Sequence, residues 1–540
     1  MRATPLDLLH DEPLPRADFT FLREAVAFAF ETGTGGDVFE RLATEMPLLP
    51  SAFDDEQFAK DVFLDELVTQ CMPVVAEGRP VASTSRLLRR LVGRPPRDHA
   101  TVRFRQAILR ELASAPELAT ALESVGARLH ELADGLTTSP SLRLDPNRRR
   151  LDALRSFVDV VRASCSFLRA TSGLRRLGTW ATRVHGSEAF SRVVELLAYE
   201  EGAAELDLRV RVGFDGRIRA LAVVGVHERT QSPFHVPWYK RWAERLGLVA
   251  RGYRFTDQEI LARLIDEVYT GIESELLWLL LVVGDIDVYL GMLALKRGAE
   301  RTGLSVCLAE LGDGGERTLE GLFNPLLVAD GVSVVPCDMH ANAPDALTIV
   351  TGPNSGGKTR LLQSLVFAQL LGQAGFFVPA RRARLPRADG LFVSLLEQSR
   401  ADQREGRLGT ELLRIRRLFE RVGPGTLVVL DELCAGTNPS EGEEIFRLVV
   451  RLLGELRPAA FITTHLLAFA ARMAEEERAT SLSFLQVELD VRERPTFQFV
   501  PGVATTSLAH RTAARLGVTE ESLRRLLQQR TDEETPALPS

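Results

Sequence analysis

The chain has 540 residues, of which 45% are apolar and 26% charged, and its 66 Lys+Arg against 73 Asp+Glu give a formal net charge of −7. This balance is typical of globular proteins, excludes a wholly disordered or collagen-like chain, and gives no global sign of a nucleic-acid partner. The length suggests three or four domains. Only four basic residues are lysines, namely Lys60, Lys240, Lys296 and Lys358.

Cysteine usage and the apolar segments indicate a cytoplasmic protein. The five cysteines are scattered without a C-x-x-C pair, so neither a zinc site nor a disulfide framework is indicated. The N-terminus carries acids and prolines where a signal peptide needs an apolar run. The most apolar stretch, residues 276–283, is far shorter than the roughly 20 residues that cross a bilayer. We therefore expect no membrane partner.

The first predicted region, residues 1–140, is a helical N-terminal or core region. Apolar residues recur at three- and four-residue spacing over 54–74 and 102–132, and Pro116 is expected to break the second stretch. The dipeptide Pro95-Pro96 separates the two stretches. This part of the chain is therefore predicted to be all-α.

A second predicted region, residues 141–320, consists of long helices. It follows a polar, proline-marked connection at 137–150, and helical spacing then runs over 151–200 and again over 257–301. Together with the first region, it predicts that this part of the chain is all-α, apart from the β insertion described next.

A β-hairpin is predicted between these helices. From Glu205 the apolar period changes to two, since Leu206, Leu208 and Val210 alternate with polar residues. The pair Asp215-Gly216 divides two such runs, which is a strong hairpin signal. We expect a β insertion at about 201–255.

Beyond residue 346, short apolar strands alternate with helices, which predicts an α/β domain over 321–520. The residues after it, 521–540, are expected to be a polar tail. The chain as a whole is thus predicted to be multi-domain, with an α/β domain following the helical regions.

A phosphate-binding loop is the most specific motif in this domain. The β-branched strand 347–351 is followed by the pattern G-x-x-x-x-G-K-[ST] and then by an apolar helix over 361–371. This strand–loop–helix context is what a P-loop requires, with backbone N–H groups around phosphate oxygens and the hydroxyl on Mg²⁺. The predicted nucleotide-binding residues are Gly352, Pro353, Asn354, Ser355, Gly356, Gly357, Lys358 and Thr359.

Two further strand ends support an ATPase site. Asp431 and Glu432 end the apolar strand 426–430, where adjacent carboxylates are costly without a cation or substrate. We expect Asp431 to bind Mg²⁺ with Thr359, and Glu432 to orient or deprotonate the attacking water; a solvated strand end is the alternative. His465 follows a third strand, at the place of a γ-phosphate sensor, although a lone histidine is more often structural.

These motifs resemble the MutS family of ABC-class ATPases over about residues 320–520. The words that carry the resemblance are TGPNSGGKT at 351–359, GQAGFFVPA at 372–380, DELCAGTNPSEG at 431–442, TTH at 463–465, NPLL at 324–327, VPCD at 335–338 and the dimerising segment over about 501–518.

The resemblance implies a P-loop ATPase that binds ATP and Mg²⁺ as a homodimer, with Glu432 and His465 catalytic and Gln373 and Gly406 adding to the nucleotide site. Gly406 stands where the family has its signature serine, so hydrolysis is expected to be slow. Two other departures are Cys434, where the family has glycine, and the missing adenine-stacking aromatic near Val334.

The motif wording is similar to the MutS-two branch. The chain contains no Phe-x-Glu mismatch wedge, and we expect it to lack both the mismatch-reading domain and a Smr domain.

In MutS relatives a clamp domain inserted in the levers grips DNA, and the predicted hairpin occupies that place. Its basic residues suit sequence-independent phosphate binding, although a solvated strand face beside a small aromatic core is an equal alternative. The candidate nucleic-acid residues are Arg209, Arg211, Arg217, Arg219, Lys240 and Arg241.

The resemblance therefore implies an ATPase that couples nucleotide state to binding of branched, damaged or mismatched DNA, in repair or recombination control, with structure-selective rather than sequence-specific binding. Two alternatives stay open. One is a MutS-two-like ATPase that acts on ribosomes or RNA, and the other is an ATP-switched dimeric scaffold with little hydrolysis.

Overall fold

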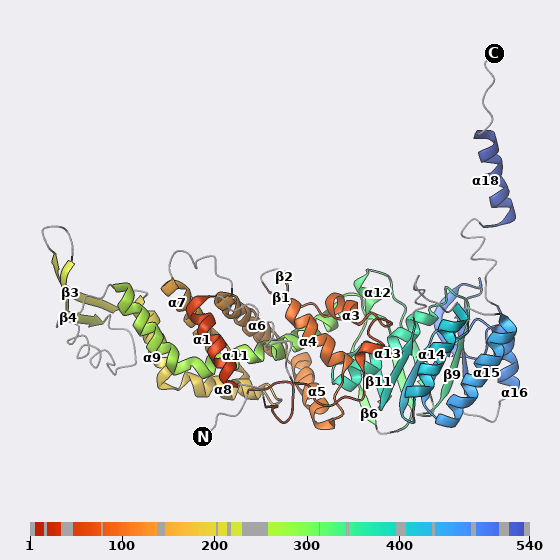
Figure 1. Cartoon of the computed structure of the whole chain (residues 1–540), viewed down its shortest axis with the longest axis horizontal. Coiled ribbons are helices and arrows are strands. Elements are labelled where there is room, and N and C mark those ends of the chain that lie inside the picture. The colour runs from red at the N-terminus through yellow and green to blue at the C-terminus, as the bar shows by residue number, and fades with distance from the viewer. Residues whose placement is uncertain are drawn as a thin grey trace, which may run out of the picture. The chain divides into compact units, whose positions relative to one another are not determined.

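The computed structural model describes residues 6–15, 19–33, 47–76, 79–137, 146–200, 204–212, 218–228, 257–312, 314–341, 343, 345–395, 407–434, 438–476, 482–506 and 518–533 (Figure 1). The chain forms two compact units. The first comprises Met1–Leu49, Met72–Leu88 and Asp98–Ala294, and the second Pro50–Cys71, Arg89–Arg97 and Leu295–Ser540. The first predicted region is thus divided between both units.

The first unit is helical. Its α5 begins at an N-cap, Asp98, whose carboxylate accepts hydrogen bonds from the backbone of Ala100 and Thr101, and α6 starts with Pro116, a favoured first helical residue. The break predicted at Pro116 is confirmed. The helices of this unit are α1 (Phe19–Thr32), α5 (His99–Ser114), α6 (Pro116–Thr137), α7 (Pro146–Ser164), α8 (Arg175–His185), α9 (Glu188–Glu200) and most of α4 (Ala82–Gly93) and α11 (Asp257–Arg301).

The predicted single helical stretch over 151–200 is wrong in detail, because it consists of α7, a 3-10 turn (Cys165–Arg169), α8 and α9. The turn and α8 approach so closely that a Cβ on Gly178 would lie 2.1 Å from the backbone nitrogen of Leu168. Helical periodicity alone does not predict that the 3-10 turn packs against the next helix.

Helix α11 covers the predicted range 257–301. It contains an 18-residue window with a mean hydropathy of 2.0, which is apolar enough to span a membrane by length and composition alone. Because 83% of that window is buried inside the protein, the apolar sequence is explained by core packing.

A buried ion pair lies in this unit. His130 Nε2 and Asp287 Oδ1 are 2.8 Å apart, and the other oxygen of Asp287 accepts a hydrogen bond from Thr84. Burial lowers the pKa of His130, but the hydrogen bond and charge of Asp287, with a contribution from Asp134, outweigh it, so the net pKa is raised.

This ion pair predicts a pH-dependent stability. A histidine with a raised pKa in the folded state contributes stability that is complete below its unfolded pKa of about 6.5 and is lost as pH rises through the folded pKa. Thermal unfolding between pH 5.5 and 9 should show this loss in the wild type and not in Asp287→Asn. An equal change of melting temperature with pH in both proteins would contradict the role of this ion pair. The control variant is Asp159→Asn, because Asp159 forms an ion pair with Arg128 at the surface.

The hairpin is present as β3 (Ala204–Val212) and β4 (Ile218–Glu228), paired antiparallel. The predicted hairpin is therefore confirmed within these bounds, while Asp215-Gly216 lies outside the described residues. A short antiparallel pair, β1 (Val75–Ala76) and β2 (Arg79–Pro80), also precedes residue 300.

The second unit is built on a six-stranded sheet. Its strand order is β12-β13-β14-β9-β15-β16, in which the first five strands are parallel and β16 is antiparallel to β15. The α/β domain predicted in this part of the chain is confirmed. The strands are β9 (Leu347–Thr351), β12 (Gly390–Ser394), β13 (Thr426–Leu430), β14 (Ala459–Thr463), β15 (Leu482–Leu489) and β16 (Pro495–Pro501).

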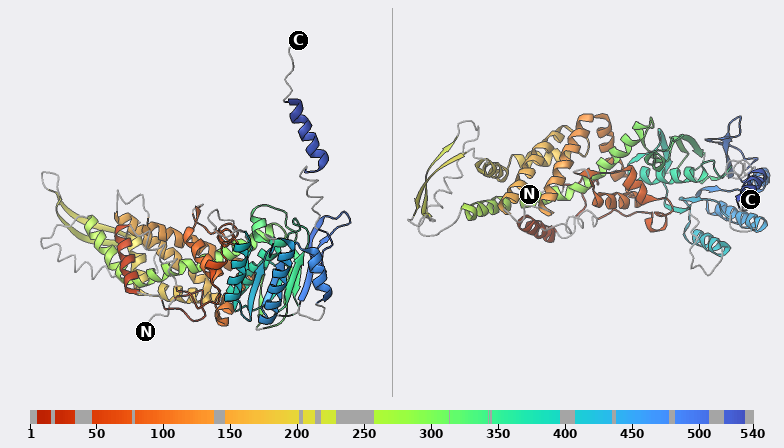
Figure 2. Two further views of the ribbon diagram at one scale, coloured as in Figure 1. Left: turned by 45° about the vertical axis from the view of Figure 1, so that its right-hand side comes forward. Right: turned by 90° about the horizontal axis from the view of Figure 1, so that it is seen from above.

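Helices cover the sheet on both faces (Figure 2). Leu418, Phe446 and Phe469, from α14 (Arg407–Arg421), α15 (Pro439–Leu456) and α16 (Leu467–Glu476), form one core with Val428 and Ile462 of the strands.

On the other face, α13 (Lys358–Ala374) contacts β13, β14 and the strands of a second sheet. Contact on several sides explains why α13 is apolar almost all round.

The second sheet, with order β6-β11-β7-β8, was not predicted. It consists of β6 (Glu310–Gly312), β7 (Arg317–Leu322), β8 (Cys337–Ala341) and β11 (Arg382–Pro386), beside the pair β5 (Cys307–Leu308) and β10 (Phe377–Val378). These short strands lack a long alternating run, and β6, β10 and β11 among them pack against α13.

Two other predictions differ from the structure. Residues 54–74 do not form one helix but contain a 3-10 turn (Asp55–Gln57) and the helix α3 (Leu64–Cys71). Helix α3 packs against α12 (Pro325–Ala329). The polar tail predicted from 521 instead begins with α18 (Glu520–Glu533), in which Glu520–Arg524 and Glu521–Arg525 ion pairs at four-residue spacing favour a helix.

Candidate nucleotide-binding site

The predicted site residues meet at one edge of the six-stranded sheet. Strands β13, β14 and β9 are parallel and in register, with Leu430 opposite Ile462 and Thr463 opposite Val350. Their carboxyl ends therefore lie side by side, and the segments that follow them leave the sheet at the same edge. This edge is where α/β proteins with parallel sheets bind ligands.

The loop between β9 and α13 requires its glycines. Gly352 and Gly357 have φ values of 140° and 86°, in the region that L side chains rarely adopt. A Cβ on Gly352 or Gly356 would lie 2.6 or 2.8 Å from the side chain of Val487 on β15. The loop thus packs tightly on β15, and only glycine fits at these positions.

Lys358 is folded back over this loop. Its side chain is buried, and Nζ donates to the carbonyl oxygens of Gly352 (2.9 Å) and Pro353 (3.2 Å). Burial lowers the pKa of Lys358, and the carboxylates of Glu432 and Asp431 partly offset this by favouring the charged form. An anionic ligand in the loop would stabilise the ammonium further.

Hydroxyl and carboxylate oxygens converge next to the lysine. Thr359 Oγ1 donates to Asp431 Oδ2 at 2.5 Å, and Thr463 Oγ1 donates to Asp431 Oδ1 at 2.5 Å. The Thr463 hydroxyl also accepts a hydrogen bond from the backbone N–H of Glu432 at 2.8 Å. Thr463 was not among the predicted site residues, although its position as the last residue of β14, the strand beside β13, could have identified it.

These oxygens fit Mg²⁺. Magnesium prefers oxygen ligands and usually takes only one or two protein groups, with water and phosphate completing the octahedron. Thr359 and Asp431 already face each other, while the described residues contain no cluster of three or more His, Cys, Asp or Glu that could hold a metal alone. The pair is therefore a suitable partial ligand set for a phosphate-bound cation.

The turn after β13 has unusual backbone geometry. Glu432 and Cys434 have φ values of 48° and 64°. The carboxylate of Glu411, on α14, accepts a hydrogen bond from the Cys434 N–H and holds the turn in place. Burial, followed by the charge of Glu411, raises the pKa of the Cys434 thiol to about 12, so this cysteine is not a thiolate nucleophile at neutral pH.

An exposed aromatic ring lies beside the loop. Phe497 on β16 has a φ of 62° and is 43% exposed, and its Cδ1 would lie 3.3 Å from a Cβ placed on Gly357. Its neighbour Gln498 donates to the Pro336 carbonyl at 2.9 Å. Sequence reasoning missed Phe497, because the ring reaches the loop from a hairpin about 140 residues further along the chain.

The other predicted residues are placed less centrally. His465 follows β14 at the same edge and is exposed. Gln373 is not brought to the loop: it lies near the far end of α13, roughly 20 Å along the helix from Thr359, and both its amide atoms bond to the backbone of Ala388. It therefore fixes the connection between β11 and β12.

Several predicted residues cannot be placed. Gly406, Arg217, Lys240 and Arg241 lie outside the described residues, and Arg209, Arg211 and Arg219 lie in β3 and β4, whose side chains the structure does not describe.

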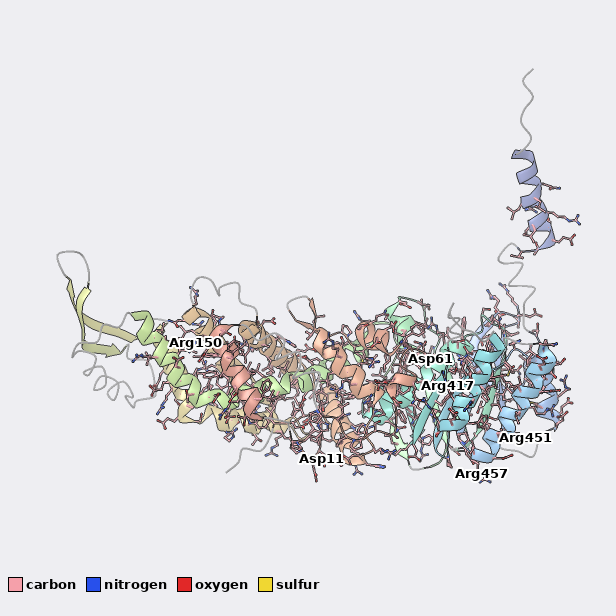
Figure 3. The ribbon with its side chains drawn as sticks, in the orientation of Figure 1. Asp11, Asp61, Arg150, Arg417, Arg451 and Arg457 are labelled. Carbon is pink, nitrogen blue, oxygen red and sulfur yellow. The ribbon has the colours of Figure 1, made fainter. Side chains whose placement is uncertain are left out.

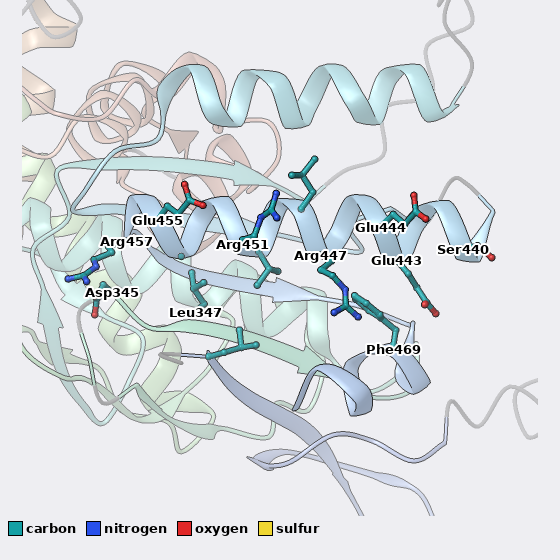
Figure 4. A pocket seen from close by; sticks show the side chains of 14 residues that line it. Asp345, Leu347, Ser440, Glu443, Glu444, Arg447, Arg451, Glu455, Arg457 and Phe469 are labelled. Atoms are coloured by element: carbon teal, nitrogen blue, oxygen red, sulfur yellow. The ribbon is translucent and has the colours of Figure 1, made fainter. Parts of the chain in front are cut away.

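A large cavity lies elsewhere in the second unit. It has a volume of about 1250 Å³ and follows the outer side of α15, where Arg447, Arg451 and Glu455 line it near Asp345 and Phe469 (Figure 4). None of the loop residues 352–359 lines it. The cavity is thus separate from the candidate site.

Comparison with known proteins agrees with this site. Residues 348–529 match the family described as MutS domain V. The Endonuclease MutS2 of Thermus thermophilus is 29% identical over 236 residues, which are 44% of this chain and 31% of that protein.

Two further relatives are similar over the same part. The Endonuclease MutS2 of Thermomicrobium roseum is 32% identical over 211 residues (38% of this chain, 26% of that protein), and the mitochondrial DNA mismatch repair protein MSH1 of Arabidopsis thaliana is 31% identical over 180 residues (33% and 16%). The similarity thus covers about a third or less of each relative. These matches show that the C-terminal region is similar to domain V of the MutS family.

Proposed function

We propose that the protein is a MutS-like ATPase that couples its nucleotide state to binding of DNA. The observation that carries the proposal is the convergence of Lys358, Thr359, Asp431 and Glu432 at one sheet edge. The similarity to proteins named as MutS2 and as a DNA mismatch repair protein supports a role in DNA repair or recombination control.

Phosphoryl transfer at such a site depends on positioning and electrostatics. The backbone of residues 352–357 and the ammonium of Lys358 would bind the phosphates of ATP, while Thr359 and Asp431 would hold Mg²⁺, which neutralises charge on the phosphate oxygens. Glu432 would orient or deprotonate the attacking water, and His465 would interact with the terminal phosphate.

Phe497 offers the exposed aromatic surface that the sequence does not provide near Val334. We expect Phe497→Ala to weaken ATP binding roughly tenfold, since stacking of a base on an aromatic ring is worth about 1–3 kcal/mol. Calorimetric titration with ATP and with inorganic tripolyphosphate would separate the base from the phosphates.

Phe497→Ala should weaken the binding of ATP but not of tripolyphosphate, whereas Phe497→Trp should bind ATP as the wild type does. The matched control is Val491→Ala, on the fully exposed turn of the same hairpin. An equal loss of tripolyphosphate binding would show that the variant disturbs the loop instead.

The remaining parts of the proposal follow from the resemblance. We propose a homodimer in which the partner completes each ATP site, a cytoplasmic location, and structure-selective binding of branched, damaged or mismatched DNA through the basic residues of the β3–β4 hairpin. Hydrolysis is expected to be slow, because Gly406 would contribute a backbone N–H to the partner's phosphate but no hydroxyl.

DNA binding in different nucleotide states tests the coupling. The full-length protein should bind a four-way junction with at least severalfold different affinity in the presence of ATP and of ADP, since a ligand shifts a conformational equilibrium only through differential affinity. The coupling would be refuted if the protein bound the junction no more tightly than duplex DNA with either nucleotide, and if Lys358→Ala bound both DNAs in the same way.

The glycine at position 406 favours one second candidate, an ATP-switched dimeric scaffold with little hydrolysis. In that case ATP would promote dimer formation in wild type and Glu432→Gln equally, and phosphate release would not differ between them.

A further inference from the structure

A loop from the N-terminal third of the chain, residues 58–63, contacts the end of β12 and the helix α13, which carries Thr359. In this loop, Asp61 Oδ2 accepts a hydrogen bond from the backbone N–H of Leu395 at 3.1 Å (Asp61 is labelled in Figure 3). The carbonyl oxygen of the next residue, Val62, accepts a hydrogen bond from Gln363 Nε2 at 3.0 Å. All of these residues belong to the second unit.

The first contact reaches Asp431 through a single peptide group. The N–H of Leu395 and the C=O of Ser394 are the two polar ends of one planar peptide unit. The Ser394 carbonyl oxygen accepts a hydrogen bond from the Asp431 N–H at 2.9 Å. The Asp61 carboxylate thus fixes the peptide that holds the backbone of the predicted metal ligand.

The second contact reaches the helix that carries Thr359. Gln363 lies one turn beyond Thr359 on α13 and is 2% exposed. Its amide oxygen accepts hydrogen bonds from Asn324 Nδ2 at 2.6 Å and from Arg360 at 2.9 Å, while its amide nitrogen donates to Val62. Because the side chain of Gln363 is bonded at both ends, the loop is fixed relative to the start of α13.

The loop itself is held rigidly. Val62 is fully buried, and Phe63 has a φ of 58°, a costly geometry for a bulky residue that persists only where the surroundings enforce it. The Leu64 N–H closes the turn on the Ala59 carbonyl at 2.9 Å. At its start, the buried Asp55 forms ion pairs with Arg94 at 2.6 Å and Arg89 at 3.1 Å.

We infer that Asp61 is a positioning residue of the ATPase site, one that sets the Asp431 backbone relative to Thr359. This rests on the proposed function. Mg²⁺ demands near-ideal octahedral geometry, so a carboxylate and a hydroxyl that share it tolerate little relative displacement. Groups that orient metal ligands without touching the metal commonly change metal affinity by about 10- to 100-fold when removed.

Two variants and a control test the inference in the full-length protein. Asp61→Ala removes the acceptor of the Leu395 N–H, whereas Asp61→Asn retains an oxygen that can accept it. Glu56→Ala is the matched control, because Glu56 is an exposed carboxylate on the same segment. The readouts are hydrogen exchange of the Leu395 amide without nucleotide, the Mg²⁺ concentration that half-saturates ATP hydrolysis, and metal-free ATP binding.

In Asp61→Ala, we expect faster exchange at Leu395 and a roughly tenfold higher Mg²⁺ requirement, with metal-free ATP binding unchanged. Asp61→Asn and Glu56→Ala should resemble the wild type in all three measurements.

An unaltered Mg²⁺ requirement in Asp61→Ala would overturn this inference but not the proposed function. The same holds if Glu56→Ala shows the same shift, or if Asp61→Asn does not keep the wild-type value. Absence of ATP hydrolysis in the wild type would instead overturn the proposed function.

Discussion

Replacement of Glu432 by glutamine is expected to lower the rate of ATP hydrolysis by about 100-fold or more while ATP binding is retained. The backbone N–H of Glu432 donates to the Thr463 hydroxyl next to Asp431, and the charge of the Glu432 carboxylate acts on Lys358, so this carboxylate lies close to the predicted phosphate site. Glutamine has the same shape but cannot accept a proton. Single-turnover phosphate release, with ATP binding measured in parallel, checks the prediction.

The control is Glu411→Gln, which changes a carboxylate of α14 that contacts the same turn but retains an oxygen to accept the Cys434 N–H. It should affect hydrolysis much less. A Glu432→Gln protein that hydrolyses ATP at the wild-type rate would remove Glu432 from the mechanism.

Replacement of Lys358 by alanine is expected to weaken ATP binding by roughly 30-fold or more, since removal of one member of a buried charge pair costs about 2–5 kcal/mol. The ammonium is buried and points at the loop carbonyls of Gly352 and Pro353, where phosphate oxygens would replace them. Equilibrium titration with ATP in the presence of Mg²⁺ measures the loss.

Two substitutions sharpen this test. Lys358→Arg should also bind ATP poorly, because a planar guanidinium does not fit a loop closed around a compact ammonium. Lys296→Ala, which changes a lysine paired with Glu300 on α11, should bind ATP as the wild type does. Wild-type affinity in Lys358→Ala would exclude the loop as the phosphate site.

Local patterns predicted the strands that end at the candidate site. The strand before the loop, the acidic strand end at Asp431 and the strand before His465 could be assigned from short apolar runs and the residues that end them. Their convergence follows from parallel strand order, because carboxyl ends of parallel strands share one edge. Helix α11 was also predictable, since its apolar residues extend without a break over its whole length.

Contacts between distant segments could not be predicted in this way. Phe497 reaches the loop from the β15–β16 hairpin, and Asp61 bonds to a residue 334 positions further along the chain. Nothing in the local sequence around Asp61 distinguishes it from Asp54 or Asp65, which are exposed. Gln373 shows the opposite error, because it stands within a family-like motif and yet its amide bonds to Ala388.

The most direct test of the account is Mg²⁺-dependent phosphate release from ATP by the purified full-length protein, measured beside Lys358→Ala and Glu432→Gln. The account predicts slow but measurable release by the wild type that is lost in both variants, with ATP still bound by Glu432→Gln. Release that is no faster in the wild type than in Lys358→Ala, or that is unchanged in Glu432→Gln, would contradict it.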